Sequence, residues 1–183
     1  MPEFLYDALI TQSSNCDGFA NAFSLICNMS GIPCFEKMMH GEGEDDGHTW
    51  NCVYMGGSYY NADLTGALDA EEDMHSETYL FFPDEYSIYS FEYKNVLPEC
   101  TDTSLSGYDC AFTSESDSQI VKTLVSEFRN NQSKYVCAFF GSMSKDRAER
   151  VVDMFFNQVN CDIEYYTAEP INGNVYSIII NSV

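Results

Sequence analysis

Hydrophobic residues between positions 16 and 30 recur three and four residues apart, a spacing that predicts an amphipathic helix. The apolar positions are Cys16, Phe19, Ala20, Phe23, Ile26 and Cys27. Asn15, or one of the two serines before it, can cap the start of this helix. Gly31 suits the C-terminal cap, and the Ile32-Pro33 pair that follows prevents the helix from continuing.

Downstream of this helix the pattern changes to one typical of strands. Residues 34–39 predict a short strand, residues 49–55 a second and residues 58–64 a third, with Gly56-Gly57 as the two-residue turn between the last two. If Met55 pairs with Ser58, His48 and Asp63 fall on one face of the hairpin as diagonal neighbours. A slip of one residue in this register would separate them.

A different pattern begins at residue 108. Residues 108–113 and 135–140 predict strands, and two amphipathic helices are predicted, one that starts at a capping box of Ser116 and Gln119 and one across residues 148–159. Residues 161–167 and 174–181 predict a closing hairpin across Asn172-Gly173. The order β-α-β-α-β-β indicates a small α/β unit with partly parallel pairing.

The chain is therefore expected to contain two domains. Residues 1–100 would form the core domain, in which aromatic residues at 86–93 complete the sheet as packing. Residues 101–107, rich in Ser and Thr, are interpreted as a linker. Residues 108–183 show no nucleophile, phosphate loop or metal set, so we interpret them as an accessory module that packs on the core or helps to recognise a substrate.

Three residues of the core domain could form a catalytic triad. Cys16 offers a thiol at the positive end of a helix dipole, a position that favours the thiolate. His48 offers an imidazole that could accept its proton, and Asp63 a carboxylate that could orient the imidazole. Each residue alone has a simpler structural interpretation, as a core cysteine, a strand-end histidine or an aspartate that leads into a turn. Their order and expected placement favour catalysis.

The motifs around these residues resemble the transglutaminase-like superfamily of papain-type cysteine enzymes. The chain reads C-D-G-F-A-N-A-F from Cys16, followed by G-I-P, then H-T-W-N from His48 and Y-Y-N-A-D-L-T around Asp63. The family pattern is a helix-capping Cys in C-x-G-[YF]-A, a His in H-x-W-N and an Asp in D-x-T. The resemblance covers roughly residues 5–100 and implies an α+β papain-like core, in which the nucleophile helix packs on an antiparallel sheet.

The resemblance also implies a reaction, namely acyl transfer from an amide or peptide carbonyl through a thioester. Cys16 would be the nucleophile, His48 the general base and acid, and Asp63 the orienting carboxylate. The expected function is a cysteine peptidase or amidase that acts on proteins or on peptides of a bacterial cell wall. The alternatives are a transglutaminase, in which an amine replaces water as the acceptor, and a non-catalytic binding module on the same fold.

Neighbouring residues could assist this chemistry. Papain-like enzymes use an upstream Gln as an oxyanion donor, a role that Gln12 or Asn15 could take, while the backbone N–H of Cys16 is the safer donor. Gly18 would leave room beside the sulfur for a substrate backbone. Trp50, the single tryptophan, would shield the triad from water or would simply be a core residue.

Charge and terminal sequence limit the partners and the location. The chain carries 29 acidic and 8 basic residues, a net charge of −21, which repels nucleic acids and anionic membranes and suits neutral or basic peptides. No apolar run approaches the length of a membrane span, and no signal peptide is visible. Only fifteen residues precede Cys16, so the chain is either an excised domain of a longer, secreted or cell-surface protein or lacks the N-terminal helices usual in the family. No pattern predicts an oligomeric state.

The cysteines and acidic loops predict no cofactor. The chain has eight cysteines but no C-x-x-C motif, and its acidic loops lack EF-hand spacing, so neither zinc nor calcium is expected. Cys100 and Cys110, on either side of the linker, are the best candidates for a disulfide. The acidic loop at 41–47 is a solvated connection or, alternatively, a flap that faces the substrate.

Overall fold

The computed structural model describes residues 2–39, 47–69, 76–87, 96–130, 135–141, 143–159, 163–167 and 176–182 of the 183-residue chain. These residues form two compact units, of which the first contains the described residues up to Gly107 and the second begins at Tyr108. The acidic loop at 41–46, the aromatic segment at 88–95 and the turn at Asn172-Gly173 lie outside the described residues.

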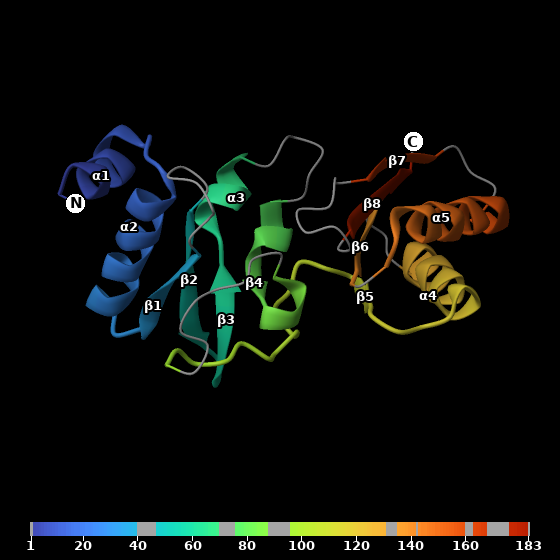
Figure 1. The fold of residues 1–183 in the computed structure, drawn as a ribbon, viewed down its shortest axis with the longest axis horizontal. Coiled ribbons are helices and arrows are strands. Elements are labelled where there is room, and N and C mark those ends of the chain that lie inside the picture. Colours follow the sequence, from blue (N-terminus) through green and yellow to red (C-terminus); the bar gives the residue numbers. More distant parts are fainter. Residues whose placement is uncertain are drawn as a thin grey trace. The chain divides into compact units, whose positions relative to one another are not determined.

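The first unit combines short helices with an antiparallel sheet of strand order β1-β2-β3-β4. Its elements are α1 (Pro2–Tyr6), the π-helical turn η1 (Asp7–Thr11), α2 (Cys16–Met29), β1 (Cys34–Met39), β2 (His48–Met55), β3 (Ser58–Ala62), α3 (Leu64–Asp69), the 3-10 helix η2 (Ser76–Tyr79), β4 (Leu80–Phe82) and the 3-10 helix η3 (Asp84–Tyr86). Helix α2 lies against one face of the sheet (Figure 1). This is the expected α+β core. The helix predicted over residues 16–30 is found at Cys16–Met29, and the strand predicted at residues 34–39 is confirmed.

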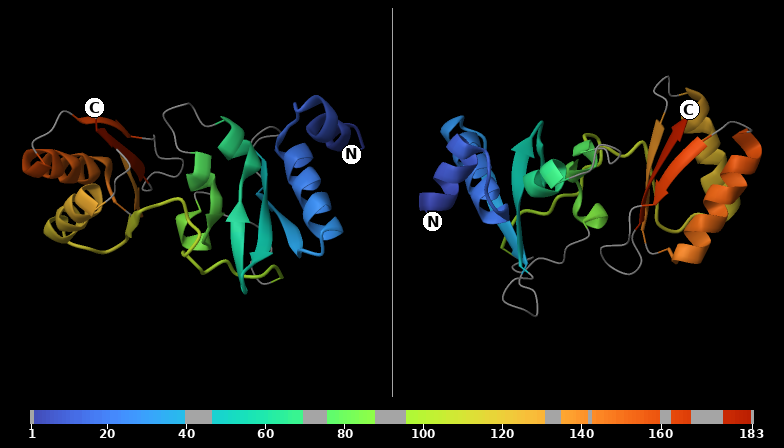
Figure 2. Two further views of the ribbon diagram at one scale, coloured as in Figure 1. Left: turned by 180° about the vertical axis from the view of Figure 1, so that it is seen from behind. Right: turned by 90° about the horizontal axis from the view of Figure 1, so that it is seen from above.

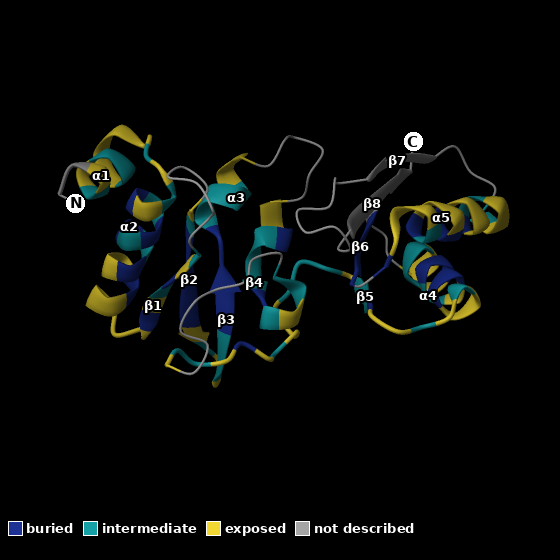
Figure 3. Cartoon of the chain, in the orientation of Figure 1, coloured by how far each residue is buried: buried dark blue, intermediate teal, exposed yellow. Residues whose placement is uncertain are grey.

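The core of the first unit forms between α2 and the centre of the sheet. Its buried members come from α2 and the first three strands and are Cys27, Cys34, Val53, Tyr60 and Ala62. Strands β2 and β3 carry most of the buried positions of this sheet (Figure 3). The helix therefore docks by only part of the face that its sequence predicts. Ala20 and Cys27 are buried as expected, whereas Ile26 is 52% exposed and Ser24, which the predicted face does not include, is buried.

The β2–β3 hairpin has the predicted register, in which Met55 pairs with Ser58. Gly56 and Gly57 form its turn with φ values of 61° and 107°, the left-handed conformations that a two-residue hairpin turn requires. The returning strand ends at Ala62, whereas the sequence predicted residues 58–64. It ends early because Asp63 caps α3: its side-chain oxygen Oδ1 accepts a hydrogen bond from the Gly66 N–H at 2.9 Å.

The residues predicted as a linker, 101–107, belong to the first unit in this structure. The hydroxyl of Ser104 hydrogen-bonds with the hydroxyl of Tyr60 in β3 at 3.0 Å. The pKa of the Asp102 carboxyl is lowered, chiefly because it accepts hydrogen bonds from Ser104. Residues 101–107 are therefore hydrogen-bonded to the sheet through Ser104 and Tyr60.

The second unit has the predicted element order β-α-β-α-β-β. Its elements are β5 (Cys110–Phe112), α4 (Asp117–Asn130), β6 (Tyr135–Phe140), α5 (Lys145–Val159), β7 (Ile163–Thr167) and β8 (Tyr176–Ser182). The strand order is β5-β6-β8-β7, with β5 and β6 parallel and the other neighbours antiparallel. Partly parallel pairing is thus confirmed, and the predicted capping box places Gln119 Oε1 at 3.0 Å from the Ser116 N–H.

Helices α4 and α5 lie together on one face of the second sheet (Figure 2). They contribute Ile120, Leu124, Val151 and Phe155 to a core that β6 completes. The pKa of the Cys110 thiol, at the edge of this core, is raised because burial disfavours the thiolate. Among the described residues, no helix is both long and apolar enough to cross a bilayer.

Gly18 allows the N-terminal segment to pack on α2. A Cβ atom at this position would lie 2.7 Å from the carbonyl oxygen of Phe4 and 2.9 Å from the Cβ of Ser14. Ser14 itself donates a hydrogen bond to the Phe4 carbonyl at 3.1 Å. The space beside Gly18 is therefore filled by the protein's own N-terminal segment, which gives this glycine a packing role.

We expect Gly18→Ala to lower the free energy of unfolding by about 1–3 kcal/mol, because the added methyl group collides with backbone and with Ser14. Urea unfolding followed by circular dichroism measures the change. Asn21→Ala, in the same helix, is the matched control and should be neutral or slightly stabilising because alanine has the higher helix propensity. A Gly18→Ala protein as stable as the wild type would contradict this packing.

Candidate active site

Cys16 is the first residue of α2, as the sequence predicts. Asn15 caps the helix from an extended backbone conformation, and its side chain accepts a hydrogen bond from the Gly18 N–H at 3.0 Å. Cys16 itself is partly exposed. The thiol therefore sits at a capped helix start, where backbone N–H groups have no partner within the helix and can stabilise negative charge.

His48 and Asp63 meet at one end of the β2–β3 hairpin. The Nε2 atom of His48 lies 2.8 Å from Oδ2 of Asp63. The Asp63 side chain is fully buried, whereas that of His48 keeps 17% of its surface exposed. Since Asp63 Oδ1 accepts from Gly66, each carboxylate oxygen has a defined partner and the imidazole is held in a fixed orientation.

The hydrogen bond to Asp63 also determines which nitrogen of His48 can act as a base. A carboxylate accepts hydrogen bonds, so Nε2 carries the hydrogen in this pair. Nδ1 is then the nitrogen that can take up a proton. A carboxylate at Nε2 further stabilises the imidazolium that forms when it does so.

A hydrogen bond between side chains ties the start of α2 to the start of β2. Thr49, which follows His48, donates through Oγ1 to Oδ1 of Asp17, which follows Cys16, at 2.5 Å. One turn further along α2, the carbonyl oxygen of Ala20 accepts a hydrogen bond from the side chain of Asn51 in β2 at 3.0 Å. Helix and strand thus begin at the same end of the unit, which brings the thiol-bearing and imidazole-bearing residues into one neighbourhood.

Trp50 covers the histidine from within the sheet. Only 1% of its surface is exposed, and its ring stacks on that of His48 with a centroid distance of 6.0 Å and an interplanar angle of 17°. The indole Nε1 donates to Oδ1 of Asn61 at 3.1 Å. The indole therefore contacts His48 and is hydrogen-bonded to Asn61, a position compatible with both the shielding and the core interpretation.

The two further residues considered as oxyanion donors lie just before Cys16. Gln12 ends the η1 turn in a left-handed backbone conformation, with φ 57°, and its side chain is exposed. Asn15 uses its side-chain oxygen to cap α2, so the side-chain nitrogen is the atom that could donate to a substrate.

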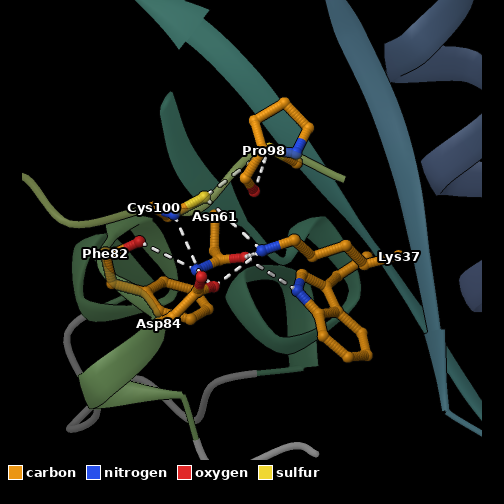
Figure 4. A network of polar contacts seen from close by, with 8 residues as sticks. Lys37, Asn61, Phe82, Asp84, Pro98 and Cys100 are labelled. Atoms are coloured by element: carbon orange, nitrogen blue, oxygen red, sulfur yellow. Dashed lines mark hydrogen bonds and ion pairs between the residues drawn. The ribbon is translucent and has the colours of Figure 1, made fainter. Parts of the chain in front are cut away.

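Sequence analysis did not find a buried polar group behind Trp50, which we call the lysine cluster: Lys37, Asn61, Asp84 and Cys100 (Figure 4). Lys37 is fully buried. Its Nζ donates to Asp84 Oδ1 at 2.6 Å and to Asn61 Oδ1 at 2.9 Å. Residues 34–39 read C-F-E-K-M-M, so Lys37 lies in a predicted strand whose other residues, apart from Glu36, are apolar. This apolar setting is the one sequence signal that could have indicated burial of Lys37.

The predicted disulfide between Cys100 and Cys110 is wrong for this structure, because both residues are free thiols. Cys100 belongs to the lysine cluster instead, and its sulfur lies 3.5 Å from that of Cys52. Within the described ranges, no three His, Cys, Asp or Glu residues gather into a set that could hold a metal ion.

The family model described as the Transglutaminase-like superfamily matches residues 3–64, a segment that contains Cys16, His48 and Asp63. Residues 3–64 belong to this superfamily. It includes cysteine peptidases and acyltransferases.

Two curated relatives are similar to part of this chain. Kyphoscoliosis peptidase from Homo sapiens is 34% identical over 70 residues, and the protein of that name from Mus musculus matches to the same extent. The matched stretch covers 32% of this chain and 10% of each relative. The chain thus spans about a tenth of the length of these relatives.

We expect Asp17 and Thr49 to be energetically coupled, because their hydrogen bond joins α2 to β2. A double-mutant cycle with Asp17→Ala and Thr49→Val should give a coupling energy of about 1 kcal/mol or more in the free energy of unfolding, measured with urea. Pairing Asp17→Ala with Thr103→Val, at an exposed site without this contact, should give additive changes. Additivity in the first cycle would show that the bond does not join the two elements.

Proposed function

We propose that the first unit of this chain is a cysteine peptidase that cleaves peptide or amide bonds with a Cys16–His48–Asp63 triad. The observation that carries the proposal is the 2.8 Å contact between His48 Nε2 and the buried Asp63 carboxylate, in a unit whose helix begins at Cys16. The hydrogen bond from Thr49 to Asp17 supports a meeting of thiol and imidazole. The partial exposure of Cys16 favours catalysis over a sealed binding module.

In the proposed mechanism, Nδ1 of His48 takes the proton of the Cys16 thiol. The thiolate attacks the carbonyl carbon of the substrate and forms a tetrahedral intermediate. When this collapses, the imidazolium gives its proton to the departing amine, and a thioester remains on Cys16. His48 then removes a proton from water, which attacks the thioester and releases the carboxylic acid.

The negative oxygen of the tetrahedral intermediate needs hydrogen-bond donors that are already in place. The backbone N–H of Cys16, at the start of α2, is the first donor we propose. The side-chain amide of Gln12 or Asn15 would supply a second. Removal of one such donor typically lowers kcat by about 10²–10³.

The acceptor decides between a peptidase and a transglutaminase, since the same triad serves both reactions. We favour water because both relatives carry the name peptidase. Proteins or peptides, including those of a cell wall, are the proposed substrates. The net charge of −21 favours neutral or basic ones, and a secreted or cell-surface setting would be consistent with cell-wall substrates.

We expect Cys16 to be the thiol that iodoacetamide labels first at neutral pH, because His48 can remove its proton. Burial raises the pKa of Cys34 to about 11, so that thiol stays protonated and serves as the internal control. Peptide mapping by mass spectrometry gives the rate at each cysteine. His48→Ala should slow labelling of Cys16 at least tenfold and leave Cys34 unchanged, whereas equal rates at both cysteines in the folded wild type would refute the activated thiol.

The acceptor can be identified with a glutamine-containing peptide, incubated with and without a large excess of a primary amine. We expect the hydrolysed product to dominate in both reactions and Cys16→Ala to form neither product. Mass spectrometry distinguishes the acid from the amine adduct, and Cys110→Ala, in the second unit, is the matched control that should retain activity. A dominant amine adduct would assign the chain to the transglutaminases.

A further inference from the structure

Two buried thiols face each other on the side of β2 away from α2. The sulfur atoms of Cys52 in β2 and Cys100, in the segment after β4, lie 3.5 Å apart. Both residues are buried, with 0% and 1% of their surface exposed. The proposed peptidase mechanism uses neither, and they lie 48 positions apart in the chain.

The surroundings make the two thiols chemically unequal. Lys37 Nζ lies 3.5 Å from the sulfur of Cys100 (Figure 4). The pKa of Cys100 is lowered, first by its hydrogen-bonding contact with the Cys52 thiol, and further because the Lys37 ammonium attracts negative charge. The pKa of Cys52 is raised by the same contact with Cys100 and by burial. Cys100 is thus the better nucleophile, and Cys52 retains its proton.

We propose that Cys52 and Cys100 are a redox-active pair that a low-molecular-weight disulfide, such as oxidised glutathione, converts to an intramolecular disulfide. The Cys100 thiolate attacks one sulfur of the small disulfide, forms a mixed disulfide and releases one small thiolate. Cys52 then loses its proton and attacks the Cys100 sulfur, which displaces the second small thiol. Two protein thiols are oxidised and one small disulfide is reduced to two thiols, so the exchange balances.

The positions of the two residues permit this bond. A disulfide has a sulfur–sulfur distance of about 2.05 Å, so the atoms must approach by about 1.5 Å. Cys52 is fixed in the centre of the sheet, but Cys100 lies in a segment without regular secondary structure. Small disulfides would reach Cys100 when this segment opens locally, a motion that costs less than global unfolding.

The bond would act on the lysine cluster. The Cys100 N–H donates to Asp84 Oδ2 at 3.0 Å, and the Asp84 N–H donates to the Cys100 carbonyl at 2.7 Å. A shift of Cys100 would therefore also displace Asp84, and with it the ion pair that Asp84 forms with Lys37. By linking β2 to a segment distant in sequence, the disulfide should stabilise the first unit, since long closed loops restrict the unfolded chain most.

The first unit contains a matched comparison pair in Cys27 and Cys34. These thiols also lie together, in the core between α2 and β1. Burial raises the pKa of both. The lysine cluster thus distinguishes the Cys52–Cys100 pair from two thiols that are merely close and buried.

The experiment uses the full chain with Cys16→Ser, which keeps seven of the eight cysteines and removes the proposed nucleophile. The result is therefore independent of whether the chain is a peptidase. The folded protein is incubated with oxidised glutathione, the remaining thiols are alkylated, and digestion without reductant is followed by mass spectrometry. We expect loss of two thiols, a cross-linked peptide pair that contains Cys52 and Cys100, and a higher Tm that reductant reverses.

Two further variants test the order of attack. Adding Cys52→Ser should stop the reaction at one glutathione attached to Cys100, whereas adding Cys100→Ser should leave Cys52 unmodified at the same time point. Adding Cys34→Ser should leave the cross-link intact. The proposal is overturned if all seven thiols remain free, if Cys27 and Cys34 cross-link as fast as Cys52 and Cys100, or if the cross-link forms only in denaturant.

Discussion

The buried carboxylate of Asp63 is the group on which the rest of the candidate active site depends. One oxygen holds Nε2 of His48 and the other caps α3 through the Gly66 N–H. The contact with His48 could not form if the β2–β3 register slipped by one residue, because Asp63 would then point to the opposite face of the sheet. The Gly56-Gly57 turn therefore contributes to the site from the far end of the hairpin.

Strand β2 connects the candidate active site with two different layers of the first unit. Thr49 and Asn51 face α2 and bind Asp17 and Ala20. Trp50 and Cys52 face the lysine cluster, and Trp50 also stacks on His48. A buried lysine is costly unless it is paired and hydrogen-bonded, and Asp84 and Asn61 meet that requirement. The tryptophan beside the histidine is thus hydrogen-bonded, through Asn61, to a buried polar group whose charges are paired.

The sequence could predict the parts of this structure that local patterns determine. Helical spacing and an Asn cap located α2, and the glycine turn with its flanking alternation gave the register that brings His48 to Asp63. Asp63 also shows the limit of this reasoning, because its helix-capping role ended β3 two residues early. Two contacts join residues more than twenty positions apart, namely the Asp17–Thr49 hydrogen bond and the bond from buried Lys37 to Asn61. The spacing of apolar residues along the sequence does not predict such contacts. Likewise, the space beside Gly18 could not be assigned to Ser14 and Phe4 without coordinates.

The distance from Cys16 Sγ to His48 Nδ1 in a crystal structure would test the central claim most directly. We predict a separation of about 3–4 Å, with Nε2 still bonded to Asp63, because a nucleophile and its base must lie within reach of proton transfer. A sulfur atom turned into the core between α2 and β1, or an Nδ1 atom directed away from it, would contradict the triad.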